Sequence, residues 1–94
     1  MANAQRLPEG WTPVDAAGAA AIAKEIAAEV CPEHPLYGLL RSPLARSSAK
    51  DEVLFALEGD RVASIHLTWS GRQETAPWPV HTIYESTDRW LASR

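Results

Sequence analysis

The sequence predicts an α+β domain in which an N-terminal helix packs on a three- to four-stranded antiparallel sheet, followed by a short C-terminal helix. Residues 52–71 hold two runs of β-branched, aliphatic and aromatic residues joined by Gly59 and Asp60, the pattern of a β-hairpin. Residues 13–31 are rich in alanine, with apolar residues at three- and four-residue spacing, which indicates an amphipathic helix. The 94 residues suit one domain. We expect residues 1–10 to be a mobile N-terminus and residues 11–94 to fold as a single α+β domain.

The first helix has a predicted start and a predicted end. Thr12 suits the N-cap, Pro13 the first helical position, and Asp15 can complete a capping box. Pro32 ends the helix near Val30. One stripe is expected to face the sheet: Ala19, Ile22, Ala23, Ile26, Ala27 and Val30.

The central hairpin is expected to turn through two residues, because Gly59 tolerates the positive φ that a tight primed turn requires. Leu54 would then face Ile65 beneath the helix, whereas a slip of one residue would exchange the two faces. The face assigned to the core is Leu54, Ala56, Ala63, Ile65, Leu67 and Trp69. The other face is Val53, Phe55, Leu57, Val62, Ser64, His66 and Thr68.

The remaining segments complete the sheet and add a second helix. Residues 36–47 form a broken β pattern, and Pro43 places this strand at an edge or bends it. Residues 70–79 indicate a long exposed loop, and residues 80–84 a short further strand. Ser86 or Thr87 is expected to cap a last helix anchored by Trp90 and Leu91.

Composition and motifs argue against several classes of function. The net charge is −3 and the Lys and Arg residues are scattered, so a nucleic-acid surface is not expected. No apolar run has the length of a membrane span, and no secretion signal is visible. The single cysteine, Cys31, cannot form an internal disulfide and suits a reducing cytoplasm. Phosphate-loop, dinucleotide-binding, serine-hydrolase and zinc-protease motifs do not occur, so we expect no cofactor.

The strongest candidate site is a polar strip on the third strand. Ser64, His66 and Thr68 alternate along one face, and Trp69 follows directly. The strip could be the floor of a binding pocket, with His66 as acid, base or ligand donor. The interpretation that we favour is a half-solvated sheet face, because neither a nucleophile nor an orienting carboxylate can be placed beside His66. We therefore assign no catalytic residue.

A zinc site built from Cys31, His34, His66 and His81 is not favoured, because structural zinc sites normally show two close ligand pairs. Trp78 is the most distinctive of the four tryptophans, since it lies between two prolines in the long loop. It either covers the polar strip as a lid or contacts a partner.

Several segments resemble those shared by a group of small bacterial proteins to which no activity is assigned. These segments are His34–Gly38, Val53–Phe55, His66–Gly71 and Trp78–Pro79. The acidic pair Asp51-Glu52 also fits this group, whereas Arg46-Ser47 departs from its two adjacent basic residues. The resemblance implies a shared bacterial fold.

Three functional interpretations remain open. The first is a non-enzymatic protein- or ligand-binding domain, for example one like an immunity protein or antitoxin whose mild acidity complements a basic toxin. The second is a small enzyme that uses His66 with Glu74 or Asp51. The third is an obligate homodimer whose subunits pair through residues 39–46 or through the second sheet face.

Overall fold

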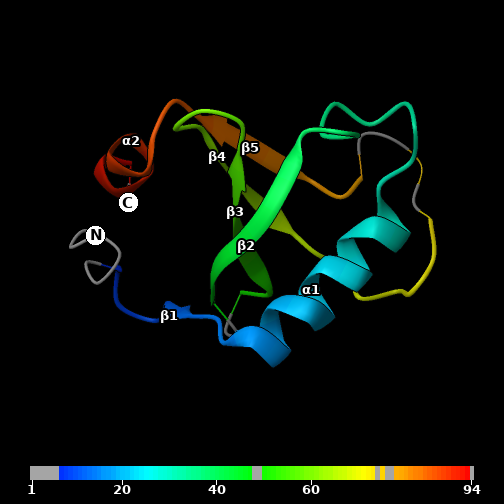
Figure 1. Cartoon of the computed structure of the whole chain (residues 1–94), viewed down its shortest axis with the longest axis horizontal. Coiled ribbons are helices and arrows are strands. Elements are labelled where there is room, and N and C mark those ends of the chain that lie inside the picture. Colours follow the sequence, from blue (N-terminus) through cyan, green and yellow to red (C-terminus); the bar gives the residue numbers. More distant parts are fainter. Residues whose placement is uncertain (1–6, 48–49, 74, 76–77, 94) are drawn as a thin grey trace.

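The computed structural model describes residues 7–47, 50–73, 75 and 78–93, which form two helices and one antiparallel sheet (Figure 1). The predicted α+β class is confirmed, and the sheet has five strands. In chain order the elements are β1 (Thr12–Pro13), α1 (Ala16–Glu29), β2 (Leu40–Ser47), β3 (Glu52–Leu57), β4 (Val62–His66), β5 (His81–Tyr84) and α2 (Thr87–Ala92).

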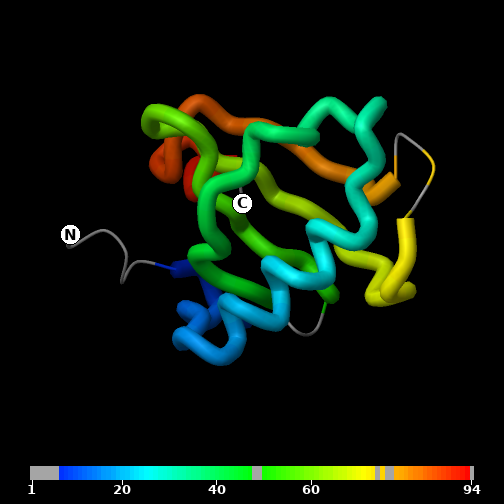
Figure 2. The backbone as a smooth tube through the Cα atoms, turned by 45° about the vertical axis from the view of Figure 1, so that its right-hand side comes forward, coloured from blue at the N-terminus to red at the C-terminus, as the bar shows by residue number. Residues whose placement is uncertain are grey.

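Helix α1 begins later than the sequence predicts. Thr12 and Pro13 form the short strand β1, and Asp15 is the N-cap, with its carboxylate accepting a hydrogen bond from the Gly18 N–H at 2.7 Å. Asp15 can take this role because its extended backbone leaves the side chain free to reach the first-turn donors. The predicted end is confirmed, since Val30 is the C-cap. Figure 2 shows α1 crossing the green strands of the sheet.

The strands follow one another in the order β1-β2-β3-β4-β5, so β1 and β5 are the terminal strands. The predicted edge strand β2 therefore lies inside the sheet, although β1 pairs with it only at Ala45 and Arg46. The predicted bend at Pro43 is confirmed, because the β2–β3 register shifts on both sides of this residue.

The hairpin between β3 and β4 turns at the predicted place but in a different register. The Leu57 N–H donates to the Arg61 carbonyl at 2.9 Å, so the loop has three residues, Glu58–Asp60, and not two. Gly59 has the expected positive φ of 73°. The extra loop residue shifts the pairing by one, and Leu54 lies opposite Ser64 where Ile65 was expected.

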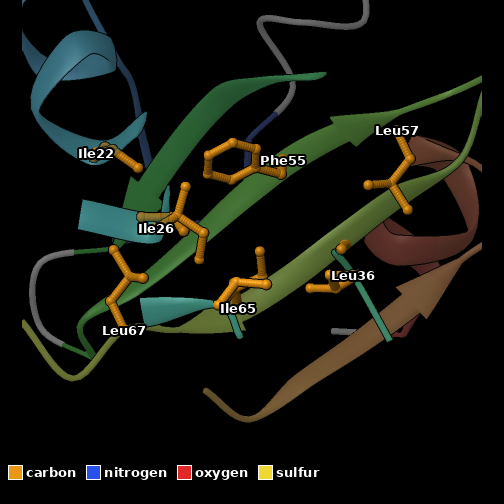
Figure 3. Packing of buried hydrophobic residues seen from close by; sticks show 10 residues of the cluster. Ile22, Ile26, Leu36, Phe55, Leu57, Ile65 and Leu67 are labelled. Carbon is orange, nitrogen blue, oxygen red and sulfur yellow. The ribbon is translucent and has the colours of Figure 1, made fainter. Parts of the chain in front are cut away.

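The register decides which face of β3 the helix covers. The predicted core residues Ala63 and Ile65 of β4, and Leu67 just beyond it, do face α1. The β3 partners of Ala63 and Ile65 are Phe55 and Val53, which come from the set assigned to the other face. Ile26 of α1 points toward Ile65 of β4 (Figure 3). The helix-side cluster is Ile22, Ile26, Val30, Leu36, Val53, Phe55, Leu57, Ala63, Ile65 and Leu67.

The second face of the sheet is also covered, which explains why Leu54 is buried although it lies away from α1. Trp90 of α2 is fully buried there and meets Trp11 edge to face, with ring centroids 4.9 Å apart. Trp11 thus packs on α2. The cluster consists of Trp11, Ala45, Leu54, Val62 and Trp90.

The predicted C-terminal helix is confirmed as α2. The hydroxyl of Ser86 accepts the Arg89 N–H at 3.1 Å and is its N-cap. In the part of the chain that the structure describes, neither helix combines the length and the apolar character needed to cross a bilayer.

Candidate functional site

The loop that follows β4 is fixed to the C-terminal half of α1 by two glutamates. One carboxylate oxygen of Glu29 accepts the Thr68 N–H at 3.1 Å, and the other accepts the Trp69 N–H at 2.8 Å. Glu25, one turn earlier on α1, accepts the Gly71 N–H at 2.8 Å. We call residues Thr68–Gly71 the Trp69 loop. Hydrogen bonds to an ionised acceptor are about twice as strong as neutral ones, so three such bonds hold this loop firmly.

Glu29 is completely buried, with an exposed fraction of 0%. Burial raises the pKa of this carboxyl above its ordinary value, and a hydrogen bond with the Glu25 side chain raises it further. The backbone N–H groups of Thr68 and Trp69 act in the opposite direction on this pKa, because they favour the carboxylate. Burial of Glu29 therefore carries a desolvation cost, which is offset by the two hydrogen bonds that position the Trp69 loop.

Trp69 is held in an unusual backbone conformation. Its φ is 57°, in the left-handed region that large side chains rarely occupy, and its side chain is 39% exposed. The guanidinium carbon of Arg46 lies 5.5 Å from the centroid of the indole, within the range of a cation–π contact. The indole thus contacts the guanidinium of Arg46 and is partly open to solvent.

A second polar cluster ties the start of β5 to the segment after α1. The Leu36 N–H donates to Nδ1 of His34 at 3.0 Å, so this nitrogen carries no proton. The other ring nitrogen, Nε2, lies 2.9 Å from the Pro79 carbonyl and donates to it. The ring of His81 lies beside that of His34, with centroids 4.7 Å apart. Burial lowers the pKa of His81, and the neighbouring His34 lowers it further, while a hydrogen bond to the Pro79 carbonyl opposes them.

The structure separates the three residues of the predicted polar strip. Ser64 and His66 lie on the sheet face away from α1, and in the ladder Ser64 pairs with Leu54 and His66 with Glu52. The strand ends at His66, and Thr68 belongs to the Trp69 loop. A continuous strip across Ser64, His66 and Thr68 is therefore absent, because the third residue leaves the strand before it can join the other two.

The tryptophans differ from expectation as well. Trp69, expected on the core face, is partly exposed because the strand ends at His66 and the positive φ of Trp69 breaks the extended conformation that would keep its side chain on that face. Trp78 is 49% exposed and His66 is also exposed, so Trp78 does not cover His66 as a lid. The interpretation of Trp78 as a contact residue stays a prediction.

Of the four residues considered for zinc, His34 and His81 lie side by side, but the other two do not join them. Cys31 is buried at the end of α1, while His66 is exposed on the far face of β4. Over the described ranges no group of three or more His, Cys, Asp and Glu side chains is placed to bind a metal ion. Glu74, which the enzyme interpretation pairs with His66, lies outside the described residues.

Sequence reasoning missed the two glutamates that hold the Trp69 loop. Its apolar stripe left Glu25 and Glu29 on other faces of the helix. Yet Glu29 follows Ile22 by seven residues and Ile26 by three, a spacing that puts it on the buried side. A carboxylate on an apolar face at the end of a helix is the signal that could have found it.

A groove of about 470 Å³ lies between α1 and the chain that leads into β2. Ala23 and Ala27 leave space along the helix, and Phe55 forms part of the apolar lining. Tyr37 and Arg41 are the polar side chains that line it, and both are exposed. The groove therefore combines an apolar interior with one phenol and one guanidinium.

The fold and the site define a small α+β domain whose sheet is covered on both faces and whose most distinctive surface feature is a buttressed tryptophan. Comparison with models of known protein families, with curated proteins and with solved structures gives no match.

Proposed function

We propose that this chain is a non-enzymatic protein-binding domain and that the Trp69 loop is its contact surface. The observation that carries the proposal is the conformation of Trp69, an exposed indole at a φ of 57° held by a fully buried glutamate. Backbone conformations of this kind cost on the order of 1–3 kcal/mol and persist where the surroundings impose them, most often at functional sites. Packing of the core gives no reason for this cost, because the indole remains partly in solvent.

Binding of a partner would explain why the strained backbone conformation of Trp69 is kept. Tryptophan and arginine are the residue types that contribute most to the energy of protein interfaces, and Arg46 lies against Trp69. A loop that is ordered before the encounter loses less conformational entropy on binding. The three hydrogen bonds that Glu25 and Glu29 accept from the loop backbone supply this order. The Trp69 loop therefore has the properties of a preorganised anchor.

The chain's charge favours one kind of partner. A net charge of −3 attracts a basic protein at long range and raises the association rate. An immunity- or antitoxin-like role, in which this domain covers a basic protein, is the specific version of the proposal. The enzyme interpretation has less support. Glu52 lies opposite His66 in the ladder, but among the described residues no hydrogen bond joins their side chains to orient the exposed His66 ring as a base.

The test compares Trp69→Ala with Trp78→Ala, a matched control of the same residue type and similar exposure. Proteins captured from a bacterial lysate by the unmodified chain are identified, and the one retained is purified and titrated against each variant. We expect Trp69→Ala to lose about 30-fold in affinity, the effect of about 2 kcal/mol at an anchor residue. Unchanged affinity of Trp69→Ala, with Trp78→Ala impaired, would refute the proposed surface.

The groove beside α1 favours a second candidate function, the binding of a small ligand. Its volume lies in the range of small-molecule sites, and Arg41 would pair with an anionic group while the apolar interior takes the body of the ligand. Medium-chain carboxylates are suitable probes. Thermal stabilisation by such a probe that is lost in Arg41→Gln and kept in Trp69→Ala would favour this function over protein binding.

A further inference from the structure

Strand β5 forms a free edge of the sheet. At the opposite end, β1 has only two residues and one of them is Pro13, which cannot donate a hydrogen bond to another strand. β5 has four residues, and among the described residues it pairs with β4 alone. In Figure 3 it lies at the margin of the sheet, beyond β4. One long side of β5 is therefore open to another strand.

The register of β4 and β5 shows which backbone groups point to this open side. The His66 N–H donates to the Val80 carbonyl at 2.8 Å, and Thr82 and Tyr84 follow Val80 at two-residue spacing. Hydrogen-bonding direction alternates along a strand, so these residues direct their backbone groups to β4. His81 and Ile83 direct theirs outward. Within the described residues, no backbone hydrogen bond outside the sheet ladder satisfies either residue.

Apart from the shortness of β5, which has four residues, this edge lacks the features by which proteins normally prevent strand pairing. Free edges usually carry charged side chains, a proline within the strand or a covering segment. From Trp78 to Tyr84 no Asp, Glu, Lys or Arg occurs, and the single proline precedes the strand. Burial keeps the His81 ring largely uncharged near neutral pH by lowering its pKa. Val80 and Ile83 are 47% and 39% exposed, so apolar surface accompanies the open backbone.

We propose that two copies of this chain pair antiparallel through β5, around a two-fold axis at Thr82, and so join their sheets into one. His81 of each copy then lies opposite Ile83 of the other and exchanges two backbone hydrogen bonds with it. A two-fold axis at Ile83 would place His81 of one copy opposite Glu85 of the other, and Glu85 lies beyond the end of β5. A second copy is the fitting occupant because the edge is self-complementary: the outward-facing residues His81 and Ile83 are spaced so that each can pair with the other across a two-fold axis at Thr82. The segment carries no Asp, Glu, Lys or Arg, so the pairing opposes no like charges within the two strands. The Trp69 loop takes no part in this pairing.

Sedimentation velocity over roughly a hundredfold range of concentration tests the oligomeric state. We expect the unmodified chain to move from monomer to dimer. Ile83→Pro removes an N–H that β4 does not use, so it should abolish the dimer while the thermal unfolding of the monomer stays close to that of the parent. Ile83→Val keeps the N–H and the β-branched side chain and should still dimerise. A monomer at every concentration, or a dimer that persists in Ile83→Pro, would overturn the proposal.

Oxidative cross-linking tests the axis. Residues at a non-hydrogen-bonded antiparallel position have Cα atoms about 4.5 Å apart, which a disulfide can span. Thr82→Cys in a Cys31→Ala background should therefore form a disulfide-linked dimer readily. Thr87→Cys in the same background, outside β5, should not. Cross-linking of Thr87→Cys but not of Thr82→Cys would refute pairing at this axis.

Discussion

Removal of the Glu29 side chain tests whether the Trp69 loop is held as the structure indicates. Glu29→Ala deletes both hydrogen-bond acceptors of the Thr68 and Trp69 N–H groups and leaves a space at a site with 0% exposure. A hydrogen bond to a charged group contributes about 1.5–3 kcal/mol. The loop can partly rehydrate after the change, so we take the lower end of this range for each bond.

The expected loss of unfolding free energy is then about 3 kcal/mol for the two bonds together. In a domain of this size each kcal/mol lowers Tm by about 4–8 °C, which gives a fall of about 12–24 °C. Glu25→Ala removes one acceptor from a half-buried residue, and it should cost about 0.5–1 kcal/mol. Urea unfolding followed by far-ultraviolet circular dichroism measures both changes.

Glu29→Gln adds a pH-dependent control. Burial raises the pKa of Glu29 above 4.5, so between pH 4.5 and this raised pKa the native state holds a proton that the unfolded chain has released. The contribution of this group to stability is therefore largest below pH 4.5 and declines as pH rises through the raised pKa. The stability difference between the parent and Glu29→Gln should decline in the same direction. Equal losses in Glu29→Ala and Glu25→Ala, or a Glu29→Ala loss under about 1 kcal/mol, would refute this account of the loop.

Three further predictions concern the second core, the hairpin turn and the histidine pair. Trp90→Ala should cost about 3–5 kcal/mol in urea unfolding, since α2 anchors the second face through this fully buried ring, and a cost near that of an exposed residue would contradict that role. Gly59→Ala should cost about 1–2 kcal/mol, because a Cβ there meets no atom within 4 Å and only the positive φ opposes it; an unchanged urea midpoint would show that the turn does not need glycine. Burial lowers the pKa of His81, so stability relative to His81→Phe should fall as pH drops below 6.5 toward the lowered value, and a pH-independent difference in urea unfolding would count against this.

Much of the fold was predictable because local patterns carry it. The three- and four-residue spacing of Ile22, Ile26 and Val30 indicates α1, and the β-rich runs around Gly59 indicate the hairpin. The register was not predictable, since a loop of two residues and a loop of three are both compatible with the same sequence around Gly59. The additional loop residue shifts the register by one, so Val53 and not Leu54 faces the helix.

The candidate site was harder to predict than the fold. The polar alternation of Ser64 and His66 suggested a continuous strip, but the strand ends before Thr68. Trp69 was assigned to the core because its position matches the period of the strand. Its exposure follows from the bond that its backbone makes with Glu29, 40 residues earlier in the chain. No window of local sequence contains both partners of that bond.

The sequence by itself determined the elements of this protein, because helix and strand periodicity and the caps depend on residues a few positions apart. The tertiary structure decided the strand register, the burial of Glu29 and the outward direction of Trp69. These depend on contacts between segments that meet only when the chain has folded, and each is settled by which buried donors and acceptors find partners there.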